Sequence, residues 1–145
     1  MSSETSKLKG FARTIDGQLG ILNESEYFKQ KYRDLNIIVL LINTDERYAA
    51  LVTIKDANVS VDGIKFDRKN SKEVKQLIKT TKWDGMLKVD TEQFFAIATG
   101  KMKTSGLLKL VLQRNLRGIK AMLSFSKLFG VIGHEMKKRA KESGD

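Results

Sequence analysis

Few residues in this sequence could perform acid–base, nucleophilic or metal chemistry. There is one histidine and no cysteine, which excludes thiol catalysis, iron–sulfur clusters, cysteine-ligated zinc and sites built from several histidines. His134 stands next to Glu135, but no partner nucleophile can be named for it. The motifs Gly-x-Ser-x-Gly, His-Glu-x-x-His and Gly-x-Gly-x-x-Gly are absent. We therefore expect no catalytic residue, no metal site and no cofactor, and a protein that is not an enzyme.

The segment Thr99-Gly100-Lys101 is the nearest match to a phosphate-binding loop. A P-loop requires Ser or Thr directly after the lysine and a second glycine five positions before the Gly of the Gly-Lys pair. Met102 and Phe95 occupy those two positions. The segment is therefore not a P-loop.

Positive charge is concentrated in the last third of the chain. The formal net charge is +10, and residues 101–141 hold eleven Lys or Arg residues but one acid, Glu135. Such segregation favours an anionic contact face over a merely solubilising surface. The residues that we expect to meet a carboxylate or phosphate headgroup, or an anionic membrane, are Lys101, Arg114, Arg117 and Lys120.

An unusually apolar helix is predicted within the same third. Nine of the fourteen residues from 119 to 132 are apolar, and Lys120, Ser124 and Lys127 form one narrow polar stripe. A helix that packs on a sheet needs an apolar stripe about 100° wide, so this helix has apolar surface to spare. That surface must meet the core, a ligand, a partner or lipid. An apolar face flanked by basic residues is typical of surfaces that dock on anionic bilayers.

The elements that must position these residues form the pattern of a single α+β domain over 1–145. Residues 1–35 read as an N-terminal helical extension, 36–130 as the core and 131–145 as a basic tail. The predicted core elements, in order, are strands at 37–42, 48–54 and 59–62, a helix from Asn70, a strand at 84–90, a helix at 91–99, a strand at 111–117 and the final helix. Asp62-Gly63 reads as a hairpin turn or a bulge.

Three helix starts carry capping signals. Asn23 with Glu26 and Asn70 with Glu73 have the spacing of a capping box, and Asp90 can cap the helix that follows it. No stretch reaches the roughly 18 apolar residues that span a bilayer, and the first seven residues are too polar for a secretory signal. We expect a cytoplasmic protein.

Three segments together resemble the sterol carrier protein-2 (SCP2-type) lipid-transfer domain family. They are Gly85–Met102, with a strand, a short helix, Phe and Gly-Lys; Leu110–Gly118, similar to the last strand of the family; and the apolar C-terminal helix with Leu128-Phe129. The resemblance covers about two-thirds of the chain, and the 1–35 segment lies outside it. The family usually has Gly-Lys before the last strand and Gly-Asp after it, where this chain has Gln113-Arg114 and Gly118-Ile119, so the class of lipid stays open.

The resemblance implies a five-stranded sheet covered by helices, with an apolar tunnel between sheet and helices. It also implies binding and transport of a fatty acyl chain, acyl-CoA, phospholipid or sterol without chemistry. A tunnel of this kind needs apolar walls with few polar groups. The candidate wall residues are Val39, Leu41, Ala50, Val52, Phe94, Met102, Leu108, Met122, Phe125 and Phe129.

Two other functions fit the same residues. A protein-interaction module could dock a partner chain through the helix 119–132. Nucleic-acid binding through Arg114, Arg117, Lys120 and the basic tail ranks last, because Phe125 and Phe129 lie on the apolar face of the helix instead of alternating with the cations as stacking platforms do. The sequence does not indicate an oligomeric state.

Overall fold

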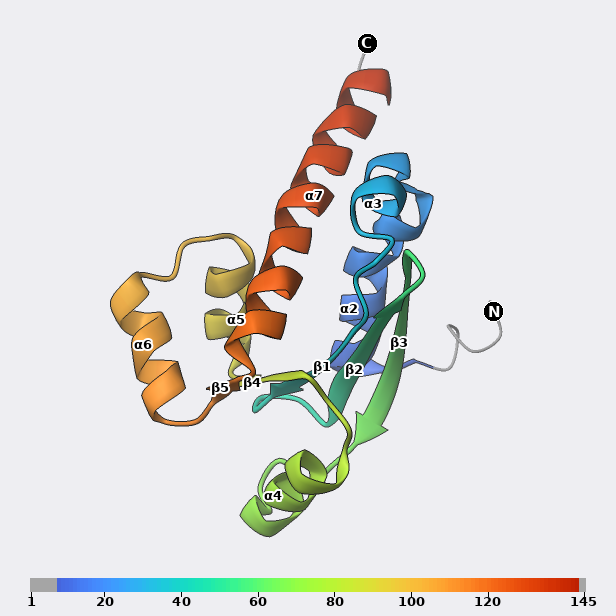
Figure 1. Ribbon diagram of the computed structural model, residues 1–145. Coiled ribbons are helices and arrows are strands. Elements are labelled where there is room, and N and C mark those ends of the chain that lie inside the picture. The colour runs from blue at the N-terminus through green and yellow to red at the C-terminus, as the bar shows by residue number, and fades with distance from the viewer. Residues whose placement is uncertain (1–7, 144–145) are drawn as a thin grey trace.

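The computed structural model describes residues 8–143, which form a five-stranded sheet with helices on both of its faces (Figure 1). The strand order is β3-β2-β1-β4-β5. Strands β1, β2 and β3 form an antiparallel meander, β4 runs parallel to β1, and β5 runs antiparallel to β4. The strands are β1 (Ile37–Asn43), β2 (Tyr48–Lys55), β3 (Asn58–Lys65), β4 (Gly85–Val89) and β5 (Leu116–Arg117). The predicted α+β class is confirmed.

Strand β1 lies at the centre of the sheet because both of its faces are apolar. Every residue of β1 except Ile38 is buried. Leu40 pairs with Leu51 of β2 on one side and with Met86 of β4 on the other. A continuous apolar run is what a strand covered on both faces requires, so the prediction for 37–42 is confirmed.

The turn between β2 and β3 is a two-residue hairpin. Asp56 and Ala57 have φ values of 52° and 59°, the left-handed backbone that matches the twist of the two strands. The second turn or bulge expected at Asp62-Gly63 is wrong: β3 continues through both residues, and Gly63 pairs with Ala50. Buried Val59 and Val61 alternate with exposed polar residues as predicted, and the strand continues past the glycine to Lys65.

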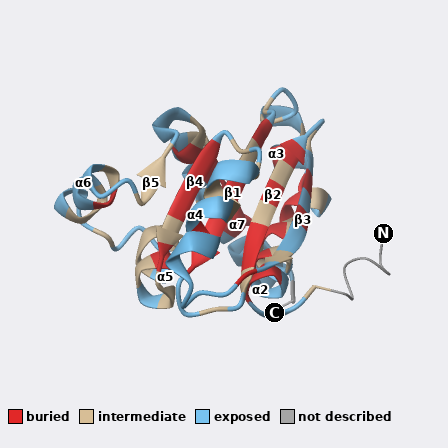
Figure 2. Cartoon of the chain, turned by 90° about the horizontal axis from the view of Figure 1, so that it is seen from below, coloured by how far each residue is buried: buried red, intermediate tan, exposed pale blue. Residues whose placement is uncertain are grey.

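The sheet carries helices on both faces, in unequal numbers. The helical elements are α2 (Gly10–Leu19), the 3₁₀ turn η1 (Gly20–Glu24), α3 (Glu26–Lys31), α4 (Ser71–Thr80), α5 (Thr91–Ala98), α6 (Thr104–Leu112) and α7 (Ile119–Ser143). Helix α4 lies alone across one face, seen in front of the sheet in Figure 2, while α2, α5 and α7 lie on the other. The α4 face packs a small core around Leu40, Ile42 and Met86, and the opposite face packs the main core.

Helix α2 belongs to the main core. Its Phe11, Ala12, Ile15 and Leu19 are buried, and the helix packs against β2 and β3. The N-terminal segment, where the structure describes it, therefore covers the sheet directly.

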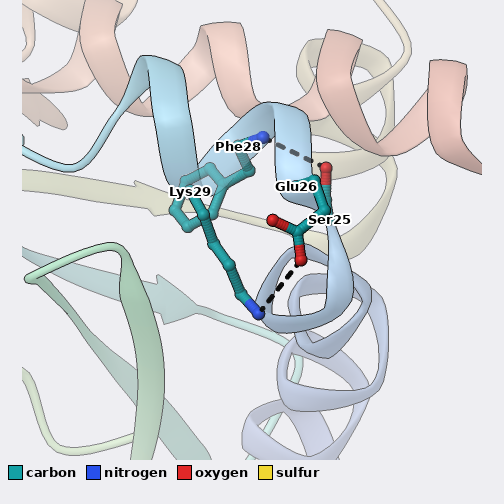
Figure 3. Close-up of polar contacts among 4 residues, drawn as sticks. All are labelled: Ser25, Glu26, Phe28 and Lys29. Atoms are coloured by element: carbon teal, nitrogen blue, oxygen red, sulfur yellow. Dashed lines mark hydrogen bonds and ion pairs between the residues drawn. The ribbon is translucent and has the colours of Figure 1, made fainter.

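Local capping differs from the prediction at the start of α3. Ser25 is the N-cap, and its buried hydroxyl accepts a hydrogen bond of 3.1 Å from the Phe28 N–H (Figure 3). Asn23, predicted as the cap, instead bonds both the N–H and the carbonyl of Val59 in β3. Glu26 forms an ion pair of 3.9 Å with Lys29, one turn along the helix. Asn and Ser are both favoured N-cap residues. Asn23 bonds β3 instead, and Ser25 caps the helix.

The other two capping predictions fared better. Asp90 and Gln93 form a full capping box at the start of α5. Asn70 caps α4, but Glu73 accepts a hydrogen bond from the Asp67 N–H and does not bond back to Asn70.

The strand predicted at 111–117 is wrong over most of its length. Residues 104–112 form helix α6, and β5 contains Leu116 and Arg117 alone. A short apolar run such as 107–112 fits a helix and a buried strand equally well. The helix ends in a turn at Gln113-Arg114-Asn115, so the sheet gains two residues and not seven.

Candidate functional site

An apolar pocket of about 480 Å³ lies between α5, α6, α7 and the β4–β5 edge. Its walls are almost entirely aliphatic and aromatic, and within the described residues no charged side chain lines it. The remaining lining positions are Gly100, Thr104 and Ser126. A mainly apolar concavity of this size falls in the range of small-molecule sites.

Six of the ten predicted wall residues line this pocket. They are Phe94, Met102, Leu108, Met122, Phe125 and Phe129. They come from three helices and the segment between α5 and α6, so the fold brings together residues up to 35 positions apart.

Edge-to-face aromatic contacts hold the back of the pocket. The Phe125 and Phe129 rings lie 5.4 Å apart at 85°, and Phe129 meets Phe94 at 6.1 Å and 77°. Phe94 in turn contacts Phe11 of α2 at 5.2 Å and 87°. Such pairs have a preferred geometry and add stability beyond the area they bury. This wall of the pocket is therefore continuous with the main core.

The opposite wall is exposed. Leu108 of α6 is 58% exposed, and Ile119 and Leu123 at the start of α7 are 51% and 59% exposed. Leu112, one turn after Leu108, is 83% exposed. Clustered exposed apolar side chains of this kind mark surfaces that bind a ligand, a partner or a membrane.

The other four predicted wall residues do not line the pocket. Val39, Leu41, Ala50 and Val52 are fully or almost fully buried in the main core. They lie on β1 and β2, and α2 packs against β2 where the resemblance implied open space. Helix α2 therefore covers β2, while α7 packs against β1.

The four predicted headgroup cations separate into two pairs. Lys101 is exposed between the pocket residues Gly100 and Met102, and Lys120 is exposed beside Ile119. Arg114 and Arg117 are not brought to this pocket: both line a second cavity that α4 residues also line.

Several lining residues were missed from the sequence. They are Leu87, Ile97, Leu107, Val111, Leu116, Ile119 and Leu123. Residues 107, 108 and 111 share one face of a helix, a signal hidden by assigning 111–117 to a strand. Leu87 and Leu116 pair across β4 and β5, which no local pattern predicts.

Among the described residues, no His, Cys, Asp or Glu lines the pocket. Within residues 8–143, no group of three His, Cys, Asp or Glu side chains could hold a metal ion. His134 is exposed, with its ring 6.5 Å from that of Tyr27. Over the same described part of the chain, no helix has the length and apolarity needed to cross a membrane.

Comparison with known proteins places the fold. No protein-family model and no curated protein matches the sequence. Among solved structures, the chain is similar to a UbiJ-SCP2 ubiquinone synthesis protein, with a TM-score of 0.51 and 12% sequence identity. The match covers 86% of this chain and 98% of the other. The five-stranded α+β arrangement is thus an SCP2-type fold, as the sequence resemblance predicted.

Proposed function

We propose that the protein binds lipids with an extended hydrocarbon chain in the pocket between α5, α6 and α7, without chemistry. The observation that supports this most directly is the pocket itself, which is apolar, free of charge among the described residues and partly walled by exposed leucines. A ligand chain would cover those leucines and gain about 25 cal/mol for each Å² of apolar surface removed from water. The ligand classes are a fatty acyl chain, acyl-CoA or a similar lipid.

Positive charge on the segments that wall the pocket supports delivery to or from anionic membranes. Exposed lysines lie on α6, on α7 and in the segment before α6: Lys101, Lys103, Lys109, Lys120 and Lys127. Each basic residue near an anionic bilayer contributes roughly 1 kcal/mol to docking. Exposed Leu112 and Leu123 would enter the interfacial region. Binding to vesicles containing phosphatidylserine, and its absence with phosphatidylcholine alone, is the expected result.

The direct test is displacement of a fluorescent fatty acid from delipidated protein. Binding at micromolar concentration supports the proposal, and no binding overturns it. Leu123→Gln should weaken binding about fivefold, since a half-exposed leucine that the ligand covers loses roughly 1 kcal/mol of apolar contact. Met136→Gln is the matched control, because Met136 is equally exposed, at 59%, on the same helix but outside the pocket.

Two additional measurements test the class of lipid and the alternative function. Because the similar structure is a ubiquinone synthesis protein, ubiquinone is the second probe for displacement. The rival function is docking of a partner chain on the exposed start of α7. A stable dimer in light scattering that Leu123→Gln dissociates, with no lipid displacement, would favour that rival.

A further inference from the structure

A second cavity, of about 340 Å³, lies on the α4 face of the sheet. It is lined by residues of β1, α4 and β4, by the segments that follow β1 and precede α4, and by Gln113, Arg114, Asn115 and Arg117. Five of its lining residues are cations, and within the described residues it has no acidic lining residue. The five, here called the cleft cations, are Arg68, Lys75, Lys88, Arg114 and Arg117.

The pleat of the sheet brings two of these cations together. Arg117 is paired with Met86, and Lys88 follows Met86 by two residues on the same strand. Residues that pair, and residues two apart, lie on the same face. Lys88 and Arg117 therefore share the α4 face, while Leu87 and Leu116 face the apolar pocket.

The cleft cations have no ion-pair partner within residues 8–143. The nearby acids bond to the main chain instead: Asp45 accepts from the Thr91 N–H, and Glu73 from the Asp67 N–H. Like charges gathered without a counterion repel each other and favour an anion between them.

Main-chain carbonyls orient two of the arginines. The Arg117 Nε donates to the Arg114 carbonyl at 3.0 Å, and an Arg68 terminal nitrogen donates to the Asp45 carbonyl at 2.7 Å. Each guanidinium keeps further N–H donors, whose planar fork fits the oxygens of phosphate. Asn115, Gln113, Ser71 and Thr44 add polar groups to the lining.

The remaining lining residues are apolar. Ile42, Phe66, Val74 and Ile78 complete the cavity, and Val74 and Ile78 lie one turn apart on α4. We propose that this cleft binds a small anion that carries two or more phosphate groups joined to an apolar moiety. The volume fits a small molecule, and the convergence of five cations on one concavity favours it over an extended polymer. This proposal does not depend on lipid binding in the other pocket.

The test is a calorimetric titration of the full chain with tripolyphosphate and with a nucleoside triphosphate, at constant ionic strength. Saturable binding at micromolar concentration, accompanied by a rise in Tm, is expected because a ligand that binds only the folded state stabilises it. Tripolyphosphate alone probes the phosphate-binding part, and the nucleoside triphosphate adds the apolar contact. No saturable binding of either up to millimolar concentration would overturn the proposal.

Matched lysine variants separate the cleft from general positive charge. Lys75 is exposed on α4. Lys75→Met and Lys88→Met should each weaken tripolyphosphate binding about tenfold, because each loses a charge-assisted hydrogen bond. In the absence of ligand, Lys88→Met should not lower Tm, since it relieves repulsion. Lys109→Met removes the same charge from α6, outside this cavity, and should leave binding unchanged.

Two outcomes would contradict the assignment. Equal weakening by Lys109→Met would show attraction by net charge and no defined site. Tighter binding of a single-stranded RNA than of either phosphate ligand, with a steep inverse dependence on salt, would identify a nucleic-acid surface instead. Lys75→Met keeps the test usable if Lys88→Met fails to fold.

Discussion

Arg114 occupies a backbone conformation that usually belongs to glycine. Its φ is 61°, directly after the last residues of α6. The Asn115 N–H bonds to the Leu110 carbonyl and the Arg114 N–H to the Val111 carbonyl, the two bonds of a Schellman ending. A side chain in this left-handed position costs about 1 kcal/mol, and here it places a cation at the rim of the cleft.

Arg114→Gly should therefore stabilise the fold and weaken the cleft at once. We expect the free energy of unfolding to rise by about 1 kcal/mol in urea denaturation, while tripolyphosphate binding weakens about tenfold. Arg114→Ala is the control: it removes the same charge but keeps the strained φ, so binding falls without the gain in stability. Loss of stability in Arg114→Gly would refute this account of the residue.

Gly118 illustrates a stricter requirement at the start of α7. Its φ is +70°, and a Cβ there would overlap the Asp84 carbonyl oxygen and lie 2.8 Å from the Gly85 Cα. Gly118→Ala should lower the free energy of unfolding by about 3 kcal/mol, from backbone strain and overpacking together. Gly100→Ala has the same sign of φ, at +72°, but nothing within 4 Å, so it should cost only about 1 kcal/mol. Equal losses in denaturant titrations would show that the close approach does not matter.

At the residue scale, the sequence showed the charge and apolarity of the site residues but not the face of the sheet on which each of them lies. The positive charge of Arg114 and Arg117 is evident from composition, and so is the apolarity of Phe125. Which face of the sheet Arg117 occupies depends on its register with Met86, a contact between residues 31 positions apart. Local periodicity carries no information about such a register, so the sequence alone could not place Arg114 and Arg117 in the cavity on the α4 face.

At the scale of elements, strong periodic signals were sufficient for the meander and for α5. Strands β1 and β2 were predicted almost to their ends, and Asp90 was identified as the cap of α5. The sequence failed at α6, where the choice between helix and strand depends on a β4 edge that pairs with two residues only. It also left α2 outside the core resemblance, although α2 covers β2 and β3. Both outcomes depend on tertiary packing.

Helix α6 is held by few buried contacts, which suits a movable wall. Leu110 is its one buried side chain, and the cap residue Lys103 makes no side-chain cap bond. Few buried apolar contacts favour local opening. Amide hydrogen exchange in 104–112 should therefore be faster than in β1, and it should slow when a fatty acid fills the pocket. Unchanged exchange in the presence of a saturating fatty acid would exclude α6 from the binding site.

Two leucines of α6 should separate anchoring from binding. Leu110 is 3% exposed in the main core, so Leu110→Ala should cost about 3 kcal/mol of unfolding free energy. Leu108 is 58% exposed and lines the pocket; Leu108→Ala should cost less than about 0.5 kcal/mol yet weaken fatty-acid binding severalfold. Thermal unfolding and displacement of the fluorescent fatty acid measure the two effects. The reverse ranking of stability losses would mean that α6 packs differently.

At the scale of the whole molecule, the two cavities lie back to back across one edge of the sheet. Leu87 and Leu116 line the apolar pocket, and their neighbours Lys88 and Arg117 line the cationic cleft. Side chains alternate between the two faces along β4 and β5, so the apolar pocket and the cationic cleft lie on opposite faces of the sheet. The C-terminal third contributes Arg114 and Arg117 to the cleft, while its Lys101 and Lys120 are exposed next to residues that line the pocket.

The shared edge predicts coupling between the sites. Strand β5 has two residues, and each faces a different cavity, so a ligand on either side should order the same short strand and the turn before it. The second ligand would then lose less conformational entropy on binding, because β5 is already ordered, and this gives positive cooperativity. We expect saturation with a fatty acid to tighten tripolyphosphate binding on the order of fivefold, and the reverse titration must show the same factor, because linkage is reciprocal.

Leu123→Gln offers the internal control, since it weakens the fatty-acid site without touching the cleft. Independent binding in both titrations would show that β5 is equally ordered with and without either ligand, and that the sheet insulates one face from the other.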